Sequence, residues 1–412
     1  MNMTKNIKSI FSSELARGGS FLIVGTLIYN LLNYFFHFSM ARMLGPADYG
    51  VLASLMAIVY LFSIPSETIQ MTIAKYTAVF RAKKETGKLK SLVRRSISRG
   101  WKMGIVFLFI FIAVSPFIKS FLKLDSIIPL IILSLFIFPT LLLPIMRGVL
   151  QGSKRFKALG LSFTLEGLIK LILAVSLVFI GYKVNGAIGA VLVSSFLVFI
   201  LLYLFLRDTN KKKEKYFQSK ELYLYSLPVL VAIICITVAY SIDTILAKHF
   251  FSETNAGLYA VASLLGKMIF FALSPIAKVM FPIVVEKKES KKDYEGIIKK
   301  VLMITAGIAA VVIAIYFFFS KLIVSILFGN QYLEIAGIIG YLSIAFTLLT
   351  LSYILIFYKL SLGKKKFVLA LPFFAILEIV ALSVFNSSLL QFSIALLAVN
   401  LAMCLFLALI KK

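Results

Sequence analysis

The sequence consists of apolar runs of about 20 residues that are separated by short clusters of basic residues. A helix of that length matches the hydrocarbon core of a bilayer, which is about 30 Å thick. Hydrophobic residues make up 61% of the 412 residues and charged residues 15%, whereas soluble domains have about 45 to 50% and about 25%. The sequence therefore predicts an all-α integral membrane protein.

The positions of these runs predict twelve transmembrane helices. They are expected at residues 18–40, 47–79, 101–118, 126–149, 158–181, 186–206, 222–247, 256–285, 298–320, 333–358, 367–385 and 389–410. This division places 34 of the 44 Lys and Arg residues on one side of the membrane and 6 on the other. Because basic residues accumulate on the cytoplasmic side, both termini are predicted to be cytoplasmic in a multi-pass protein of the cytoplasmic membrane. The first run has no small-residue cleavage site and is interpreted as a retained helix.

The charge and the cysteines exclude several other classes of protein. A net charge of +27 would suggest a nucleic-acid partner in a soluble protein, but here the basic residues lie between apolar segments and predict none. Cys235 and Cys404 lie inside apolar runs and indicate neither a disulfide nor a metal site. The sequence has no phosphate-binding loop for ATP, no nucleophile elbow and no His-Glu-x-x-His pair. No metal and no cofactor are therefore expected.

The longest polar stretch, residues 207–221, separates two groups of six predicted helices. We interpret residues 1–206 and 222–412 as N-terminal and C-terminal six-helix bundles, and the stretch between them as a cytoplasmic linker. The loops on the outer side are all short, so no extramembrane domain is expected.

The two halves resemble each other where their first helix passes into the second. Residues 41–50 and 247–259 each contain Ala, a basic residue, a short turn, a glycine and an aromatic residue. The helix that follows contains a proline in both cases, Pro65 or Pro275. Halves with an even number of helices share one orientation, so we predict parallel repeats related by a pseudo-twofold axis along the membrane normal.

Lysines inside the predicted spans are the most informative candidates, because an ionisable group there costs about 2.5 to 3.5 kcal/mol and usually faces a cavity. Ser263, Lys267, Ser274 and Lys278 are spaced by 4, 7 and 4 residues, which places both lysines on one face of a helix. A basic face indicates water or an anion beside it. Lys278 could instead extend its ammonium group to the cytoplasmic interface.

The other charged candidates each have a structural and a functional interpretation. Glu166 and Lys170 have the i,i+4 spacing of a self-neutralising pair, although a buried carboxylate can also exchange its partner for a proton or a sodium ion. Asp243 is the second such carboxylate. Arg147 and Arg42 lie near helix ends, where an arginine either anchors the helix or binds an anion through its planar guanidinium group.

The first predicted helix carries polar side chains on one face. Thr26, Asn30, Asn33 and His37 recur at spacings of 4, 3 and 4 residues. Such residues either hydrogen-bond neighbouring helices or line a cavity for a polar ligand. His37 alone does not indicate a metal.

Short motifs along nearly the whole chain resemble those of a known family. They are residues 41–50 (ARMLGPADYG), 147–152 (RGVLQG), 241–243 (SID), 256–259 (AGLY) and 281–282 (FP). In this order they are similar to the polysaccharide, or O-antigen type, flippases of the multidrug/oligosaccharidyl-lipid/polysaccharide exporter superfamily. The stage V sporulation protein B branch is a related but less similar group. Twelve helices suit the polysaccharide branch.

The resemblance implies a flippase, not an enzyme, that moves a polyprenyl-diphosphate-linked oligosaccharide from the inner to the outer leaflet by alternating access. The cations expected at the anionic headgroup are Arg42, Arg147, Lys170, Lys267 and Lys278. The side chains expected at the sugar hydroxyls are Asn30, Asn33 and His37. The carboxylates expected to bind a coupling proton or sodium ion are Glu166 and Asp243.

The expected partners are this lipid-linked substrate and the surrounding membrane lipids, with a glycan polymerase and export machinery as further candidates. Two alternatives remain at this point. A cation-coupled multidrug exporter needs acidic and aromatic walls, whereas the intramembrane charges here are mainly basic. A membrane glycan polymerase or glycosyltransferase usually presents a long outer loop to its substrate, and no outer loop here is long.

Overall fold

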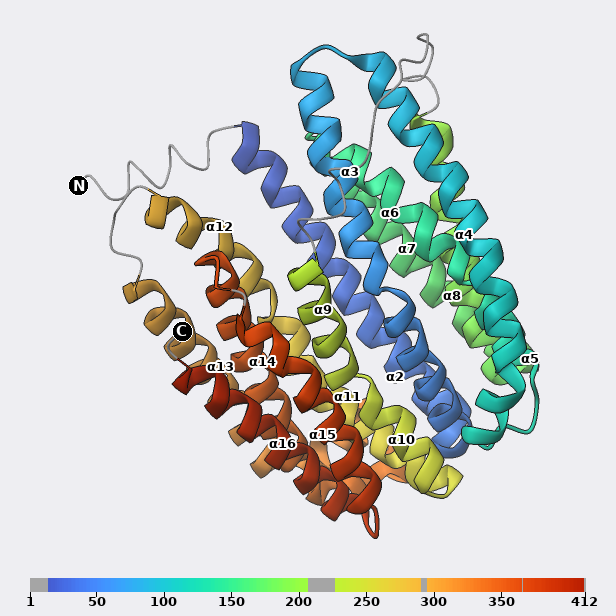
Figure 1. Ribbon diagram of the computed structural model, residues 1–412. Helices are drawn as coiled ribbons and strands as arrows, with labels where there is room; N and C mark the ends of the chain where they lie inside the picture. Colours follow the sequence, from blue (N-terminus) through green and yellow to red (C-terminus); the bar gives the residue numbers. More distant parts are fainter. Residues whose placement is uncertain (1–13, 207–226, 290–294, 365, 411–412) are drawn as a thin grey trace. The chain divides into compact units, whose positions relative to one another are not determined.

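The computed structural model describes residues 14–206, 227–289, 295–364 and 366–410, and these are almost entirely helical (Figure 1). The helices before the central gap are α2 (Glu14–Phe62), α3 (Ile64–Ala82), α4 (Thr86–Phe121), α5 (Ile128–Leu135), α6 (Ile137–Gly152), α7 (Phe156–Leu177), the π-turn η1 (Val178–Tyr182) and α8 (Lys183–Leu206). Those after it are α9 (Leu227–Ala239), α10 (Ile242–Phe250), α11 (Glu253–Leu273), α12 (Pro275–Glu289), α13 (Glu295–Leu327), η4 (Asn330–Gly337), α14 (Ile339–Ser361), η5 (Lys366–Ala370), α15 (Leu371–Val384) and α16 (Leu389–Leu409). The predicted linker, residues 207–221, lies outside the described residues.

Ten helical segments of the described part are long and apolar enough to cross a membrane. Two of them, Val24–Ala82 and Phe156–Leu206, have 59 and 51 residues, more than twice the roughly 20 residues that one crossing needs. Each is interrupted by a glycine with positive φ, Gly45 at 76° and Gly181 at 102°, a conformation that residues with a side chain rarely adopt. Dividing both segments there would give twelve spans, and the count of twelve remains a prediction.

The chain packs into two compact units. The first contains residues 14–43 and 62–206 of the described part, and the second contains residues 44–61 together with 227–410. The predicted bundle boundaries at 206 and 222 remain predictions.

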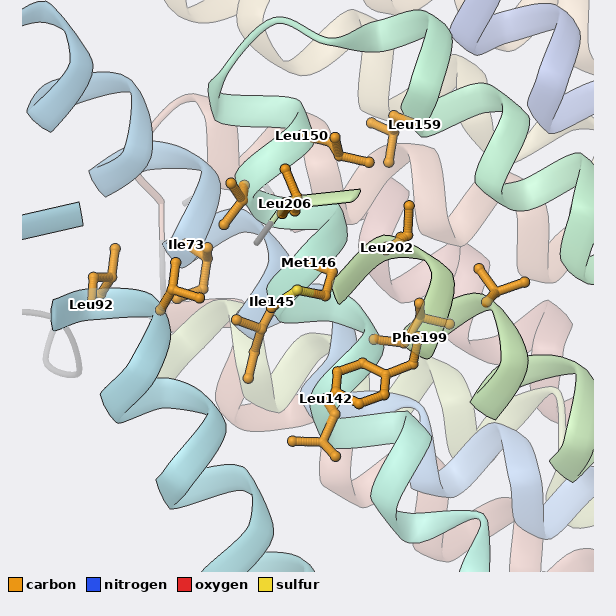
Figure 2. Packing of buried hydrophobic residues seen from close by; sticks show 14 of the residues in the cluster. Ile73, Leu92, Leu142, Ile145, Met146, Leu150, Leu159, Phe199, Leu202 and Leu206 are labelled. Atoms are coloured by element: carbon orange, nitrogen blue, oxygen red, sulfur yellow. The ribbon is translucent and has the colours of Figure 1, made fainter. Parts of the chain in front are cut away.

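Helix α6 forms the centre of the first unit, where it packs against α3, α4, α7 and α8. Figure 2 shows apolar side chains of these helices meeting around Leu142, Ile145 and Met146 of α6. In the most apolar 18-residue stretch of Ile128–Gly152, 72% of the residues are buried. In the corresponding stretch of α4 the share is 17%. Exposed side chains of α4 such as Phe109 and Phe117 are the apolar surface that a bilayer would cover.

Glycines of α6 allow a close approach to α3. A Cβ atom added to Gly148 would lie 2.7 Å from the backbone oxygen of Gln70, and one on Gly152 would overlap the backbone oxygen of Ala74. Small residues at such crossings are typical of helix packing in membranes. The RGVLQG motif thus contains a packing contact within the first unit.

Helix α14 has the corresponding place in the second unit, where it packs against α11, α12, α13 and α16. In the most apolar 18-residue stretch of α14, 67% of the residues are buried, whereas the share for Gly296–Leu327 is only 17%. The same succession of an exposed helix and a buried helix occurs in both halves of the sequence, as the predicted repeats require. The two prolines that the halves share each lie at the start of a helix. Pro65 is in the first turn of α3, and Pro275 is the first residue of α12.

Candidate functional site

Most buried charged side chains of the described part lie in two clusters, one within each unit, whereas the buried Lys248 and Lys359 lie outside them. In the first unit, Arg147 of α6 and Glu166 of α7 form an ion pair with 2.6 Å between Nη2 and Oε2. Arg147 also donates to the hydroxyl and the carbonyl oxygen of Ser162, both at 3.3 Å. The hydroxyl of Ser195 on α8 donates to the other oxygen of Glu166 at 2.6 Å. These charge-assisted bonds connect three helices around one neutral pair.

The guanidinium group of Arg147 also lies over the ring of Phe163, 3.9 Å from its centroid. A cation over an aromatic face is stabilised by the quadrupole of the ring. Arg147 is therefore held by a carboxylate, a serine and an aromatic ring, all from the helices of its own unit.

Lys170 lies one helical turn beyond Glu166 on α7 and is 4% exposed. Its ammonium group donates to the side-chain oxygen of Asn33 on α2 and lies 4.8 Å from the ring centroid of Phe36. The amide of Asn33 is oriented by its own bond of 2.9 Å to the carbonyl oxygen of Tyr29. No carboxylate of the described part forms an ion pair with Lys170.

The i,i+4 pair that the sequence predicted between Glu166 and Lys170 is therefore not formed. Glu166 is paired with Arg147, which is 19 positions earlier in the chain. A guanidinium group can bind the carboxylate and Ser162 together, whereas a lysine presents one compact charge. The first cluster thus contains two cations and one carboxylate.

The second cluster is built around Asp243 of α10, which is fully buried. Lys267 of α11 donates to one carboxylate oxygen at 2.9 Å and to the hydroxyl of Thr244 at 2.8 Å. The hydroxyl groups of Ser263 and Tyr259 donate to the other oxygen at 2.5 Å and 3.2 Å. The sequence placed Ser263 and Lys267 on one helix face, and in the structure both bind this carboxylate.

A break in the seventh predicted helix positions Asp243. α9 ends at Ala239 and α10 begins at Ile242, so the carboxylate lies in the first turn of a helix, where the macrodipole favours negative charge. This break was not predicted from the sequence. Irregular backbone at membrane depth is tolerated where protein surrounds it, and Ser241 and Asp243 are both fully buried.

Two polar residues beside this cluster were not predicted from the sequence, Glu378 of α15 and Asn400 of α16. Both are buried, at 1% and 0% exposure, and Oε1 of Glu378 and both side-chain polar atoms of Asn400 have no hydrogen-bond partner. They line a small cavity of the second unit. An ionisable residue within a predicted span is a candidate site residue. This criterion would have found Glu378, which is the one acidic residue of the predicted span 367–385.

The other predicted residues lie outside these clusters. His37 is buried beside the ring of Phe36, Asn30 is half-buried and Arg42 is exposed. Lys278 belongs to α12, and its side chain is outside the described part. No group of three or more metal-binding side chains occurs among the described residues.

These features define a multi-pass membrane protein with the fold of the MATE transporters. The inward-facing conformation of a multidrug resistance MATE family transporter of the MOP superfamily aligns with a TM-score of 0.79 and 12% identity, covering 93% of this chain and 96% of that one. The outward-facing conformation of such a transporter gives a TM-score of 0.65 and 13% identity, with 96% and 93% covered. Identities this low establish the fold alone.

Residues 39–337 match the family model described as polysaccharide biosynthesis protein. The chain belongs to this family. It is also similar to the uncharacterized membrane protein MJ1375 of Methanocaldococcus jannaschii, with 23% identity over an alignment of 314 positions that covers 70% of this chain and 72% of that protein. The predicted superfamily is thus supported, whereas the relation to the sporulation branch remains a prediction.

Proposed function

We propose that this protein is a flippase that moves a polyprenyl-diphosphate-linked oligosaccharide from the inner to the outer leaflet of the cytoplasmic membrane by alternating access. Two findings support a transporter in glycan synthesis: membership of the polysaccharide biosynthesis family and the MATE fold. In this proposal the protein moves its substrate intact and is not an enzyme. Both termini lie in the cytoplasm, as the distribution of basic residues predicts.

The environment of Lys170 is the observation that carries the proposal of an anionic substrate. Arg147 and Lys267 are each neutralised by a carboxylate of their own unit. Lys170 is held instead by an amide oxygen and aromatic rings, so its positive charge is not compensated by an ion pair among the described residues. A buried ammonium group of this kind, with the amide of Asn33 beside it, is a suitable site for a phosphate oxygen.

The physical barrier to flipping explains why such a charge is useful. An unpaired ion in a low-dielectric medium is penalised by several kcal/mol even after relaxation, and a diphosphate carries more than one charge. A cation in the path offsets part of this penalty. The inside-negative membrane potential favours outward movement of an anion by about 2.3 kcal/mol for each elementary charge and for each 100 mV of potential.

Coupling to an ion is a separate part of the proposal. Glu166 and Asp243 are the carboxylates that we propose for coupling. Each is bound to a cation and to hydroxyl groups in this structure. A change of protonation at either site would therefore have to break a buried ion pair, which sets a high barrier.

The proposal is tested with purified full-length protein in proteoliposomes that contain a fluorescent polyprenyl-diphosphate oligosaccharide. A membrane-impermeant glycan-modifying reagent reports the fraction of label in the outer leaflet, and chromatography reports whether the label is intact. We expect faster exchange between leaflets than in protein-free vesicles, with the labelled lipid unchanged. Release of polymer or free glycan would contradict the transporter assignment. Movement of an organic cation but not of the lipid would support the multidrug alternative.

A further inference from the structure

We infer that one face of α4 binds the phosphate groups of anionic glycerophospholipids through Arg95, Arg99 and Lys102. In the predicted orientation of the chain these lipids belong to the cytoplasmic leaflet. The inference goes beyond the proposed function, because it concerns the lipid that surrounds the first unit and involves no transported substrate.

Helix α4 is longer than one membrane crossing requires. Its 36 residues extend over about 54 Å at a rise of 1.5 Å per residue, whereas the hydrocarbon core is about 30 Å thick. The mainly apolar residues 103–121 would span about 28 Å and match that core. Residues 86–102 therefore continue the helix beyond the hydrocarbon, into the region of lipid headgroups and water.

This continuation of α4 is strongly basic. It contains no acidic residue and six basic ones, which are Lys88, Lys90, Arg94, Arg95, Arg99 and Lys102. Lys88 forms an ion pair with Glu85, which precedes the helix, and the last four of the six are exposed. A cluster of about four to eight basic residues next to a transmembrane helix attracts anionic lipid.

The packing of α4 on α6 determines which side of α4 is exposed. A Cβ atom added to Gly100 would lie 2.9 Å from a methyl group of Leu142, and one added to Gly104 would lie 2.7 Å from the ring of Phe138. Lys102 is two residues from both glycines, which is about 200° around the helix, and it is exposed. The basic residues at this register therefore point away from the protein.

Arg95, Arg99 and Lys102 follow each other at spacings of 4 and 3 residues, so they share this outer side of α4. We call them the basic face. At spacings of 4 and 3 the same side continues with Val106 and Phe109, which are 57% and 66% exposed. Apolar side chains exposed in this way are the surface that acyl chains would cover. Phosphate groups lie just beyond the acyl chains, so the basic face is at the headgroups of the same lipids.

Trp101 marks the level of the membrane–water interface on α4, because tryptophan is enriched there. It is the single tryptophan of the chain. Its side chain is 41% exposed, and its ring lies 4.9 Å from that of Phe138. Arg99 and Lys102 are within about 3 Å of it along the helix axis and Arg95 is within about 9 Å. Long basic side chains reach over such distances.

The chemistry of the basic face fits a phosphate group without further selectivity. Two of its three residues are arginines, whose planar guanidinium group matches two phosphate oxygens. A polyprenyl diphosphate has the same phosphate chemistry. We assign the face to glycerophospholipids because it consists of exposed side chains on the convex surface of one helix. Such a surface can bind a phosphate group but cannot recognise a particular glycan or prenyl chain.

The test uses the fluorescence of Trp101 in full-length protein reconstituted into phosphatidylcholine vesicles. These contain either brominated phosphatidylglycerol or brominated phosphatidylcholine at the same mole fraction. Bromine quenches tryptophan only at short range, so the quenching reports which lipid lies beside α4. We expect the anionic lipid to bind about two- to fivefold more strongly than the zwitterionic one. Equal quenching by both lipids would overturn the inference.

The triple variant Arg95→Gln/Arg99→Gln/Lys102→Gln keeps Trp101 and removes the basic face. Its preference for the anionic lipid should fall to about one, since the attraction is electrostatic. An unchanged preference in this variant would also overturn the inference.

The matched control removes the same amount of charge from exposed lysines in the turns that follow α3 and α6. It is the triple variant Lys83→Gln/Lys84→Gln/Lys154→Gln. This protein should keep the wild-type preference, because its substitutions leave the basic face intact. An equal loss in both triple variants would show a general effect of net charge and would contradict a site on α4.

A salt titration of the wild type keeps the test valid if the basic-face variant does not fold, as judged by its elution and thermal unfolding. Raising the salt concentration from about 0.1 M to about 1 M shortens the Debye length from about 10 Å to about 3 Å. The preference for the anionic lipid should then decrease toward one. A preference that does not change with salt would contradict binding of a charged headgroup.

A last measurement separates the two sources of phosphate. A small mole fraction of unbrominated polyprenyl diphosphate should leave the quenching by brominated phosphatidylglycerol unchanged. Complete relief of quenching would show that the face binds the carrier lipid and would overturn the assignment to glycerophospholipids. Because the fluorescence involves no flipping, failure of this inference and failure of the proposed function are separate results.

Discussion

Lys267 and Asp243 form an ion pair with 2.9 Å between Nζ and Oδ1, and both side chains are almost fully buried. Both residues belong to the second unit, where the pair connects α11 to the broken helix that begins at α10. Hydroxyl groups of Ser263 and Tyr259 complete the hydrogen bonds of the carboxylate. Lys267 was predicted to bind an anionic ligand, and Asp243 was predicted to bind a coupling ion. In the structure the two residues neutralise each other.

Breaking this pair on one side should be more damaging than removing both charges. Lys267→Met leaves a buried carboxylate and Asp243→Asn leaves a buried ammonium group, and each should lower the free energy of unfolding by about 3 to 5 kcal/mol. The double variant should lose clearly less than the sum of the two. Thermal unfolding in detergent measures all four proteins. Strictly additive losses would show that the pair contributes no coupling energy.

Arg147 should not tolerate replacement by lysine although the charge is kept. Lysine can reach Glu166 but cannot also bind the backbone and hydroxyl oxygens of Ser162, and it loses the planar contact with Phe163. We expect Arg147→Lys to be destabilised by about 1.5 to 3 kcal/mol, the range for hydrogen bonds to charged groups. Exposed Arg155→Lys is the control and should unfold at the wild-type temperature. Equal unfolding temperatures for both variants would contradict the described geometry.

The close approach of α6 to α3 makes a strong prediction for glycine substitutions. A Cβ atom at Gly148 would lie 2.7 Å from the backbone oxygen of Gln70, so Gly148→Ala should destabilise the first unit by about 1 to 3 kcal/mol. Gly189 of α8 has no atom within 4 Å of its added Cβ. Gly189→Ala should therefore be neutral or gain up to about 1 kcal/mol in helix propensity. The two unfolding temperatures should move in opposite directions or differ by several degrees.

The membrane orientation is predicted from the distribution of charge alone, and it can be tested separately. Fusion of a fluorescent protein to Lys412 should give fluorescent cells, whereas fusion of alkaline phosphatase at the same position should be inactive, because each reporter works on one side of the cytoplasmic membrane only. Active phosphatase at this position would reverse the predicted topology.

Much of the fold could be predicted because apolar length and charge are local properties of the sequence. The predicted spans 186–206 and 389–410 agree closely with α8 and α16. The breaks at Phe136 and at Tyr240 were not predicted. Such breaks depend on what neighbouring helices offer to the freed backbone groups, which the sequence does not display.

Only those features of the candidate site that depend on spacing within one helix could be predicted from the sequence. The i,i+4 rule relates Ser263 to Lys267 correctly, because both lie on one helix face. The rule failed for Glu166, whose partner Arg147 comes from another helix, and spacing carries no information on contacts between helices. Glu378 could have been found from the cost of a charge within an apolar span.

The central claim is that the positive charge of Lys170, which forms no ion pair among the described residues, serves an anionic lipid-linked substrate. Its most direct test is the initial rate of leaflet exchange of the labelled lipid for Lys170→Met, Lys170→Arg and the exposed control Lys154→Met. We expect Lys170→Met to lose at least about tenfold in rate, the equivalent of 1.4 kcal/mol, while Lys170→Arg keeps most of the activity and Lys154→Met equals the wild type. A wild-type rate in a well-folded Lys170→Met would contradict this account.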